Sequence, residues 1–293
     1  MSLKMYKNSI QPQRLFLQKL SRMRNKEKGV TLIELLVGLT IGLLTVTVGL
    51  GAIMISRGVT TTVSDTTILQ QQASYAFRVI GQQLRQAGGR PLNTVADPRD
   101  AATFVQPNAI SLSGLPPIAG IDNPTASQFV ISLRYVNASE SVYPSPPSST
   151  PITGYLSSDC IGSNPGIASA PIILNELRKN GTDLECSNSI GNVQPIIGNV
   201  ADLQIRYLQQ KLNIADNQPQ FRYASAANMG PTDWPEVYGI EVCLELEGDQ
   251  FIDTVGSTYT KCDGTTATRG NKLRMVFKNI FHIRNHAWPK TIS

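Results

Sequence analysis

The sequence predicts an α+β protein in which one long N-terminal helix packs on an antiparallel β-sheet. Three observations predict this fold: an apolar run near the N-terminus, a polar run with helical spacing directly after it, and later segments in which apolar and polar residues alternate. We therefore expect four consecutive regions: a basic cytoplasmic leader (1–29), an apolar membrane-spanning helix (30–56), its amphipathic continuation (57–90) and an extracytoplasmic β-rich domain (91–293).

The leader holds the net positive charge of the chain. Residues 1–29 contain eight Lys and Arg against Glu27, which gives +7, so the +5 of the whole chain leaves −2 for residues 30–293. The sequence pI of about 9.0 thus reflects the leader. It does not indicate a nucleic-acid-binding domain, and we expect no nucleic-acid partner.

The apolar run from Val30 to Ile55 predicts a membrane-spanning helix. It contains no charged residue except Glu34. At about 1.5 Å per residue, a helix of this length crosses a bilayer core of roughly 30 Å. A secretory signal peptide would have a shorter apolar core followed by its cleavage site. Because basic residues precede the run, the N-terminus is expected in the cytoplasm and the chain after Arg57 outside it.

Glu34 is the one charge in this run, and it admits two interpretations. A charge at mid-span costs about 2.5–3.5 kcal/mol on insertion scales, and less near an interface. The carboxylate can simply reach the head groups from the cytoplasmic end of the helix. Alternatively, it pairs with a cation that a partner chain supplies. A partner helix could approach closely at Gly38 and Gly42, whose spacing is typical of small-residue helix contacts.

The polar run that follows keeps the spacing of an amphipathic helix. Its apolar residues recur at steps of three and four, which places them on one face of a helix. These residues are Leu69, Ala73, Ala76, Ile80, Leu84 and Ala87. Gly88-Gly89 followed by Pro91 is a strong stop signal. We expect a helix over about residues 30–89, with Arg57-Gly58 as a candidate break.

Period-two alternation of apolar and polar residues predicts four β-strands with one covered face each. The alternating segments are 129–136, 203–207, 240–247 and 273–284. One long helix and four such strands indicate a helix laid over an antiparallel sheet. Residues 137–200 are rich in Ser, Pro, Gly and Asn, and we expect a long loop there.

Four cysteines, all beyond the apolar run, suggest disulfide bonds in an oxidising compartment. They are Cys160, Cys186, Cys243 and Cys262, and their wide spacing does not match that of metal ligands. Three pairings are possible. Cys160–Cys186 and Cys243–Cys262 are preferred because each pair closes a local loop, and each bond would contribute roughly 3 kcal/mol in the loop-entropy model. Four buried free thiols are the alternative.

Residues able to do chemistry are sparse, and we expect neither an enzyme nor a cofactor. The histidines His282 and His286 lie four apart in a predicted strand and so roughly 13 Å from each other, too far to share a metal. Asp263-Gly264 predicts a turn, with a calcium site as the alternative. Trp234 and Trp288 are expected in the core or at the domain edge rather than as binding platforms.

Three carboxylates share one face of a predicted strand. Glu241, Glu245 and Glu247 could mimic the paired carboxylates of a catalytic site. A solvent-exposed face is favoured instead, partly neutralised by Arg274 and Lys278 on a neighbouring strand.

The junction between the leader and the apolar run resembles the prepilin leader motif, in which a basic leader ends in Gly before Phe-Thr-Leu-Ile-Glu. Here Gly29 is followed by Val30-Thr31-Leu32-Ile33-Glu34, so Val replaces the usual Phe. The resemblance implies that a prepilin peptidase cuts between Gly29 and Val30 and N-methylates the new terminus. It also implies that Glu34 attracts the terminal ammonium of a neighbouring subunit, and this pairing would offset part of the desolvation of both charges.

The whole chain is similar in organisation to type IV pilins, and within them to the PilW family of minor pilins. The features that carry this resemblance are the segments Gly29 to Val37, Leu84 to Gly89, Leu273 to Phe277 and Ile283 to Asn285. The resemblance implies an inner-membrane precursor with a periplasmic globular domain that later joins the pilus. Its implied partners are the prepilin peptidase and other minor and major pilins.

This resemblance implies a structural role in initiating pilus assembly or at the pilus tip, and through it in twitching motility, adhesion or DNA uptake. A pseudopilin of type II secretion shares the N-terminal features and is the nearest alternative. A membrane-anchored extracytoplasmic adhesin or enzyme is the alternative from another class. It requires an uncleaved anchor and a catalytic pocket, for which the sequence offers no candidate.

Overall fold

The computed structural model describes residues 29–89, 116–125, 127–137, 139–143, 150–155, 157–165, 172–212, 218–252 and 256–283. The chain divides into two compact units, Met1–Ser56 and Arg57–Ser293. The basic residues of the expected leader precede the described part of the chain.

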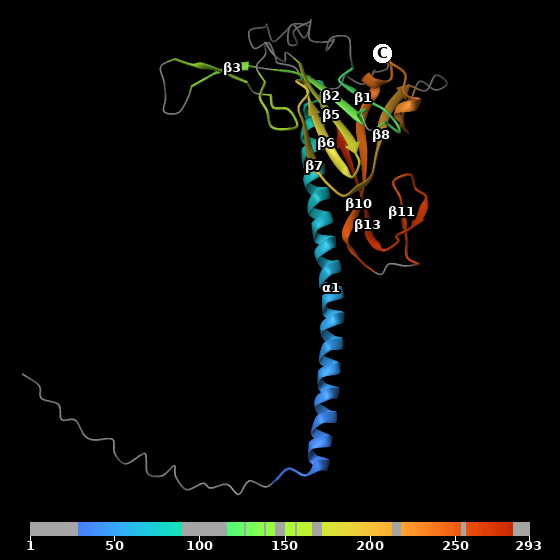
Figure 1. Ribbon diagram of the computed structural model, residues 1–293. Helices are drawn as coiled ribbons and strands as arrows, with labels where there is room; N and C mark the ends of the chain where they lie inside the picture. The colour runs from blue at the N-terminus through green and yellow to red at the C-terminus, as the bar shows by residue number, and fades with distance from the viewer. Residues whose placement is uncertain are drawn as a thin grey trace, which may run out of the picture. The chain divides into compact units, whose positions relative to one another are not determined.

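The helix α1 (Leu32–Gln86) is continuous over 55 residues (Figure 1). Arg57 and Gly58 are helical like their neighbours, so the candidate break is not present. The helix ends before Gly88, which adopts a φ of +72°, a left-handed conformation that glycine takes up without strain. The N–H of Gly88 donates to the carbonyl of Arg134 at 2.8 Å and so ties the end of the helix to a strand.

The described strands form two antiparallel sheets and two small hairpins (Figure 1). The five-stranded sheet has the order β1-β2-β5-β6-β7, and its strands are β1 (Ile118–Gly120), β2 (Ile131–Val136), β5 (Ile172–Asn180), β6 (Asp183–Asn188) and β7 (Val193–Ile197). The four-stranded sheet has the order β13-β10-β8-β9, and its strands are β13 (Lys272–His282), β10 (Val237–Phe251), β8 (Val200–Leu212) and β9 (Pro219–Ala224). The hairpins are β3 (Ser139–Val142) with β4 (Ile152–Tyr155) and β11 (Thr258–Thr260) with β12 (Thr266–Thr268).

The four predicted strands correspond to β2, β8, β10 and β13, but they belong to two sheets rather than one. The prediction of a long loop over 137–200 is wrong, because two hairpin strands and the meander β5-β6-β7 lie within it. Polar side chains at inward positions hide the alternation there. Asn175 and Asn188 are buried in the same strands as Ile173 and Leu184, so the sequence shows no clean apolar period.

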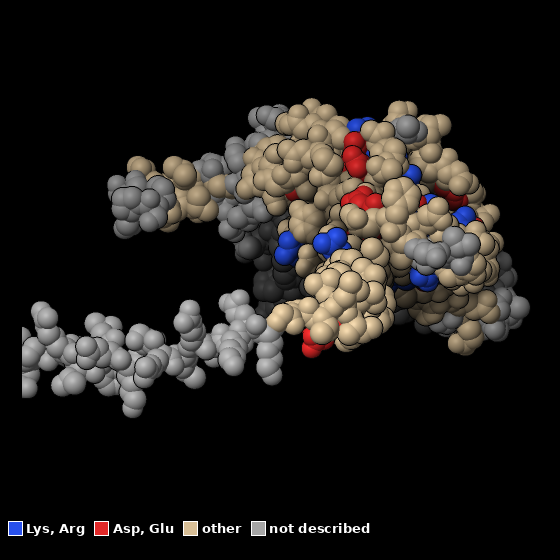
Figure 2. All heavy atoms as spheres, turned by 60° about the horizontal axis from the view of Figure 1, so that its bottom comes forward, with Lys and Arg blue, Asp and Glu red and all other residues tan. Residues whose placement is uncertain are grey.

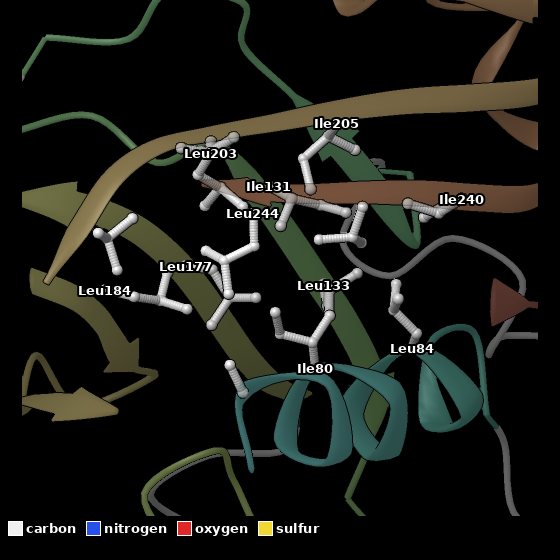
Figure 3. Close-up of a cluster of buried hydrophobic side chains, with 14 of the residues drawn as sticks. Ile80, Leu84, Ile131, Leu133, Leu177, Leu184, Leu203, Ile205, Ile240 and Leu244 are labelled. Carbon is white, nitrogen blue, oxygen red and sulfur yellow. The ribbon is translucent and has the colours of Figure 1, made fainter. Parts of the chain in front are cut away.

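The apolar stripe of α1 lies at the centre of the hydrophobic core. All six residues that its spacing predicted, from Leu69 to Ala87, are at most 1% exposed. Figure 3 shows Ile80 and Leu84 pointing from the helix toward side chains of both sheets, among them Leu133 of β2 and Ile240 of β10. Burying a side chain of this size contributes about 1.5–3 kcal/mol, so the stripe holds its part of the helix on the sheets.

A buried set of polar side chains, here called the Gln83 network, connects this helix with the five-stranded sheet. Gln83 Oε1 accepts hydrogen bonds from the Tyr135 hydroxyl at 3.0 Å and the Asn175 amide at 2.9 Å. The Tyr135 hydroxyl also lies 2.6 Å from the carbonyl of Ser158, and Asn175 Oδ1 accepts from the N–H of Cys160 at 2.9 Å. Burial raises the pKa of Tyr135, which keeps its hydroxyl protonated. An unpaired buried polar group costs about 1–3 kcal/mol, so the network favours one register of helix on sheet.

A second polar contact, between α1 and β10, depends on a glycine. Asp65 is buried, and its carboxylate accepts a hydrogen bond from the N–H of Gln250 at 3.1 Å. A Cβ at Gly248 would lie 2.5 Å from Asp65 Oδ2 and 3.4 Å from the Cβ of Leu273. A side chain at position 248 would therefore displace the Asp65 carboxylate.

Replacing Gly248 by Ala is expected to destabilise the domain by about 1–3 kcal/mol, because the added methyl group displaces the buried carboxylate of Asp65. Urea unfolding of the full-length chain in detergent, followed by tryptophan fluorescence, measures the change. Gly58→Ala is the matched control. Nothing lies within 4 Å of its Cβ position, so helix propensity predicts equal or slightly higher stability.

A double-mutant cycle tests the cause of this effect. Asp65→Ala removes the carboxylate that the new methyl group would meet, so Gly248→Ala should cost little in that background. An equal cost in both backgrounds would contradict the proposed steric conflict.

Candidate assembly site

The residues on either side of the expected cut lie in an exposed stretch that precedes the helix. Gly29, Val30 and Thr31 have no regular secondary structure, and Val30 is 70% exposed. Exposed backbone outside helices and strands is where proteolytic cleavage concentrates. The Gly29–Val30 bond is therefore exposed and lies outside regular secondary structure.

Thr31 and Glu34 form a capping box at the N-terminus of α1. The N–H and the hydroxyl of Thr31 donate to Glu34 Oε2 at 3.1 and 3.0 Å, and the N–H of Glu34 donates to the Thr31 hydroxyl at 3.3 Å. This reciprocal pairing satisfies N–H groups that a helix leaves without partners in its first turn. The Thr-x-x-Glu spacing is visible in the sequence, yet neither sequence interpretation of Glu34 included the cap.

The capping box leaves one carboxylate oxygen of Glu34 available. Both donors of Thr31 reach Oε2, and within the described part of the chain no hydrogen bond reaches Oε1. Glu34 is exposed in its own unit. The carboxylate therefore has a defined orientation at the start of the helix and can accept a further donor.

The first half of α1 carries apolar side chains on every side. All residues from Leu32 to Ser56 are exposed, and within the described residues α1 is the one helix that is long and apolar enough to cross a membrane. Figure 2 shows this part of the helix in the colour of uncharged residues, apart from one acidic group. A helix that is apolar all round belongs in lipid or against other apolar helices. Nothing lies within 4 Å of the Cβ positions of Gly38 and Gly42, where a partner helix could approach.

A comparison with protein families identifies this N-terminal segment. Residues 24–50 match the model of the prokaryotic N-terminal methylation motif, and the match includes Gly29, Val30 and Glu34. The chain therefore carries a prepilin-type N-terminal methylation motif, as its sequence predicts. Type IV pilin-type chains are structural subunits rather than enzymes, and their precursors are held in the inner membrane by the apolar helix. The motif also implies processing by a prepilin peptidase and assembly with other pilins.

Among solved structures, the prepilin is similar to a type IV-like pilin from Thermus thermophilus. The two share 12% sequence identity over 75% of this chain and 98% of that chain, with a TM-score of 0.36. None of the curated proteins compared with the chain matches it.

The globular part of the prepilin contains both preferred disulfides. Cys160–Cys186, with its Cα atoms 6.3 Å apart, joins the 157–165 loop to β6. Cys243–Cys262, with its Cα atoms 5.7 Å apart, joins β10 to the turn between β11 and β12. In each bond one cysteine lies in an inner strand and the other in a connection. Each bond therefore holds a connecting segment against its sheet.

The prediction that Glu245 lies on a solvent-exposed face of its strand is wrong. This residue is 1% exposed, and its Oε1 accepts hydrogen bonds from the Tyr259 hydroxyl at 2.5 Å and from Arg274 at 2.9 Å. Glu247 pairs with Arg274 and, at 3.2 Å, with Lys272. Tyr259 comes from β11, so the β11–β12 hairpin covers this part of the sheet. Alternation along one strand does not reveal such a cover.

The remaining carboxylate and the histidines do not form a catalytic group within the described residues. Glu241 pairs with Arg206 of β8 at 3.4 Å. His282 is exposed on β13, whereas His286 lies outside the described residues.

The other two sequence predictions concern an aromatic residue and a turn. Trp234 is half-buried and meets the ring of Tyr207 edge-on, with ring centroids 5.0 Å apart, whereas Trp288 lies outside the described residues. Asp263 accepts a hydrogen bond from the N–H of Thr265 at 2.8 Å, and Gly264 has a φ of +86°. Asp263-Gly264 is thus a turn, as the sequence predicts.

Disulfide mapping provides a direct test of the pairing. Mass spectrometry of peptides from the non-reduced full-length prepilin should find Cys160 joined to Cys186 and Cys243 joined to Cys262. The same digest after reduction is the control and should contain the four linear peptides. Any peptide that joins Cys160 to Cys243 or Cys262 would contradict this arrangement of the two sheets.

Proposed function

We propose that this prepilin is a minor pilin of a type IV pilus that acts in an assembly-initiating or tip complex. The observation that carries the proposal is the N-terminus, where an exposed Gly29–Val30 junction precedes a capped apolar helix. The two-sheet domain supports a special position, because it is larger than covering the stripe of α1 requires. Its periplasmic placement before assembly and its part in motility, adhesion or DNA uptake belong to the same proposal.

Charge pairing inside the filament is the proposed role of Glu34. The terminal ammonium of Val30, exposed after cleavage and methylation, would come from a neighbouring subunit. An ammonium and a carboxylate are each costly in an apolar helix bundle, and pairing offsets part of that cost. The capping box prepares this contact, because Thr31 holds Oε2 and leaves Oε1 for the incoming donor.

A pseudopilin of type II secretion is the second candidate, since the N-terminal motif serves both systems. The two functions differ in what the cell loses. Deletion of the gene should abolish twitching and surface pili if the proposal holds. Loss of exoprotein secretion with normal twitching would favour the pseudopilin instead.

The N-terminus of the mature protein provides the cheapest test. Mass spectrometry should find it at Val30 with one added methyl group. Gly29→Leu should leave the leader attached, because a bulky side chain replaces the glycine of the cleavage motif. Gly58→Ala, which changes a glycine far from the junction, should be processed normally. A wild-type chain that keeps its leader in cells that make pili would contradict the proposal.

Glu34→Gln separates the charge of Glu34 from its capping role. Glutamine preserves the capping box but removes the negative charge. Membrane insertion should therefore persist, while incorporation into pili falls about tenfold or more, which corresponds to roughly 1.4 kcal/mol of lost pairing. Immunoblots of sheared pili and of membranes measure both quantities.

Thr31→Ala is the complementary variant. It removes the capping hydroxyl, at a cost of about 1 kcal/mol of helix stability, and keeps the charge. Incorporation should fall less than with Glu34→Gln. If Glu34→Gln enters pili normally while Thr31→Ala does not, Glu34 acts as a helix cap and the proposed pairing is wrong.

A further inference from the structure

A surface cavity of about 380 Å³ lies in the second unit beside the first residues of β13. Its lining comes from four elements that are distant in the sequence. The lining residues are Thr66 of α1, Tyr259 and Thr260 of β11, Arg269 after β12, and Leu273, Arg274, Met275 and Val276 of β13. The lining thus combines two guanidinium groups and three hydroxyls with an apolar wall, and none of these residues carries a carboxylate.

Arg274 does not contribute an uncompensated charge to this cavity. One of its terminal nitrogens lies 2.9 Å from Glu245 Oε1, and the other pairs with Glu247. Lys272 adds a third ion pair, with Glu247, at 3.2 Å. Two cations and two carboxylates therefore balance in this cluster. The Tyr259 hydroxyl donates to Glu245, and burial together with that bond raises the pKa of Tyr259.

Arg269 differs from Arg274 in having no such compensation. Its Nε is buried and has no hydrogen-bond partner, and no carboxylate among the described residues lies within ion-pairing distance of it. A buried donor left unpaired is destabilising, and more so when it belongs to a charged group. Its guanidinium also presents a planar fork that fits a carboxylate or phosphate. The lining thus includes a cation for which the described residues provide no carboxylate partner.

We propose that this cavity binds an oxyanion carried on an apolar stem, of which an alkyl carboxylate is the simplest form. Arg269 would pair with the carboxylate, and the hydroxyl of Thr260 would donate to it. Leu273, Met275 and Val276 would contact the stem, because they are the apolar residues of the lining. Such a group can come from a small organic acid or from a glutamate side chain of another chain. The site is independent of the assembly function of the N-terminal helix.

The test uses the full-length chain in detergent, labelled with ¹⁵N, and follows the Nε–H signals of its arginines during titration with butyrate. The Arg269 signal is assigned by its absence in Arg269→Gln. We expect this signal to shift with butyrate. Acetate should shift it only at a higher concentration than butyrate does, because its stem is too short to reach the apolar wall. Arg269→Gln should weaken butyrate binding, measured by calorimetry, about tenfold or more.

Two further variants keep the result interpretable. Lys278→Gln removes one cation from an exposed position of β13 and should bind butyrate as the wild-type chain does. Thr260→Val keeps the shape of an exposed residue, so folding should persist while binding weakens severalfold. An Arg269 signal that ignores butyrate, or equal binding by Arg269→Gln and the wild type, would overturn the proposal.

Two more titrations distinguish the sources and the role of the stem. A glutamate whose α-amino and α-carboxyl groups are both blocked keeps its side-chain carboxylate free and so represents a glutamate of a partner chain. Binding as tight as that of butyrate would identify a glutamate side chain as the ligand, and much weaker binding would identify a small organic acid. Inorganic phosphate has no apolar stem and should bind less tightly than butyrate. Equal or tighter binding of phosphate would overturn the proposed role of the apolar wall.

Discussion

The packing of one helical stripe onto two sheets is the constraint on which the rest of the domain depends. Small residues such as Ala73 and Ala76 let the helix approach closely, and Leu69, Ile80 and Leu84 fill the space between them and the strands. Side chains from the five-stranded and the four-stranded sheet meet at this stripe (Figure 3). Since the sheets share one hydrophobic core with the helix, neither can shift without exposing apolar surface to water.

The same helix meets two kinds of surroundings along its length. Its residues from Leu32 to Ser56 are exposed and almost entirely apolar, whereas the stripe from Leu69 to Ala87 is buried in the domain core. An exposed apolar surface of this size is stable only in lipid or against other apolar helices. One set of side chains on this helix therefore suits both the lipid of a membrane and the apolar helices of an assembly. Glu34 is the charged exception, and Thr31 already fixes its orientation.

Polar groups inside the core specify how the elements meet. The Gln83 network connects α1 with β2, β5 and the loop of Cys160. The carboxylate of Asp65 fits against β10 because position 248 is a glycine and has no side chain. Hydrophobic burial limits how far the elements can shift, but it does not orient individual polar groups, because it is not directional. Hydrogen bonds between buried groups are directional and costly to leave unmade, so they select one arrangement.

From the sequence alone one can derive the long helix, its buried stripe, the preferred disulfides and the prepilin-type junction at Gly29, because helical period, cysteine spacing and a short motif are local properties. The tertiary structure alone placed the predicted strands in two sheets, put β5 and β6 in an expected loop and covered Glu245 with a hairpin. It also left the buried Nε of Arg269 without an acceptor among the described residues. The physical reason is that burial and charge pairing depend on which distant segments meet. A buried Asn175 or Glu245 looks, in the sequence, like any polar residue on an exposed face.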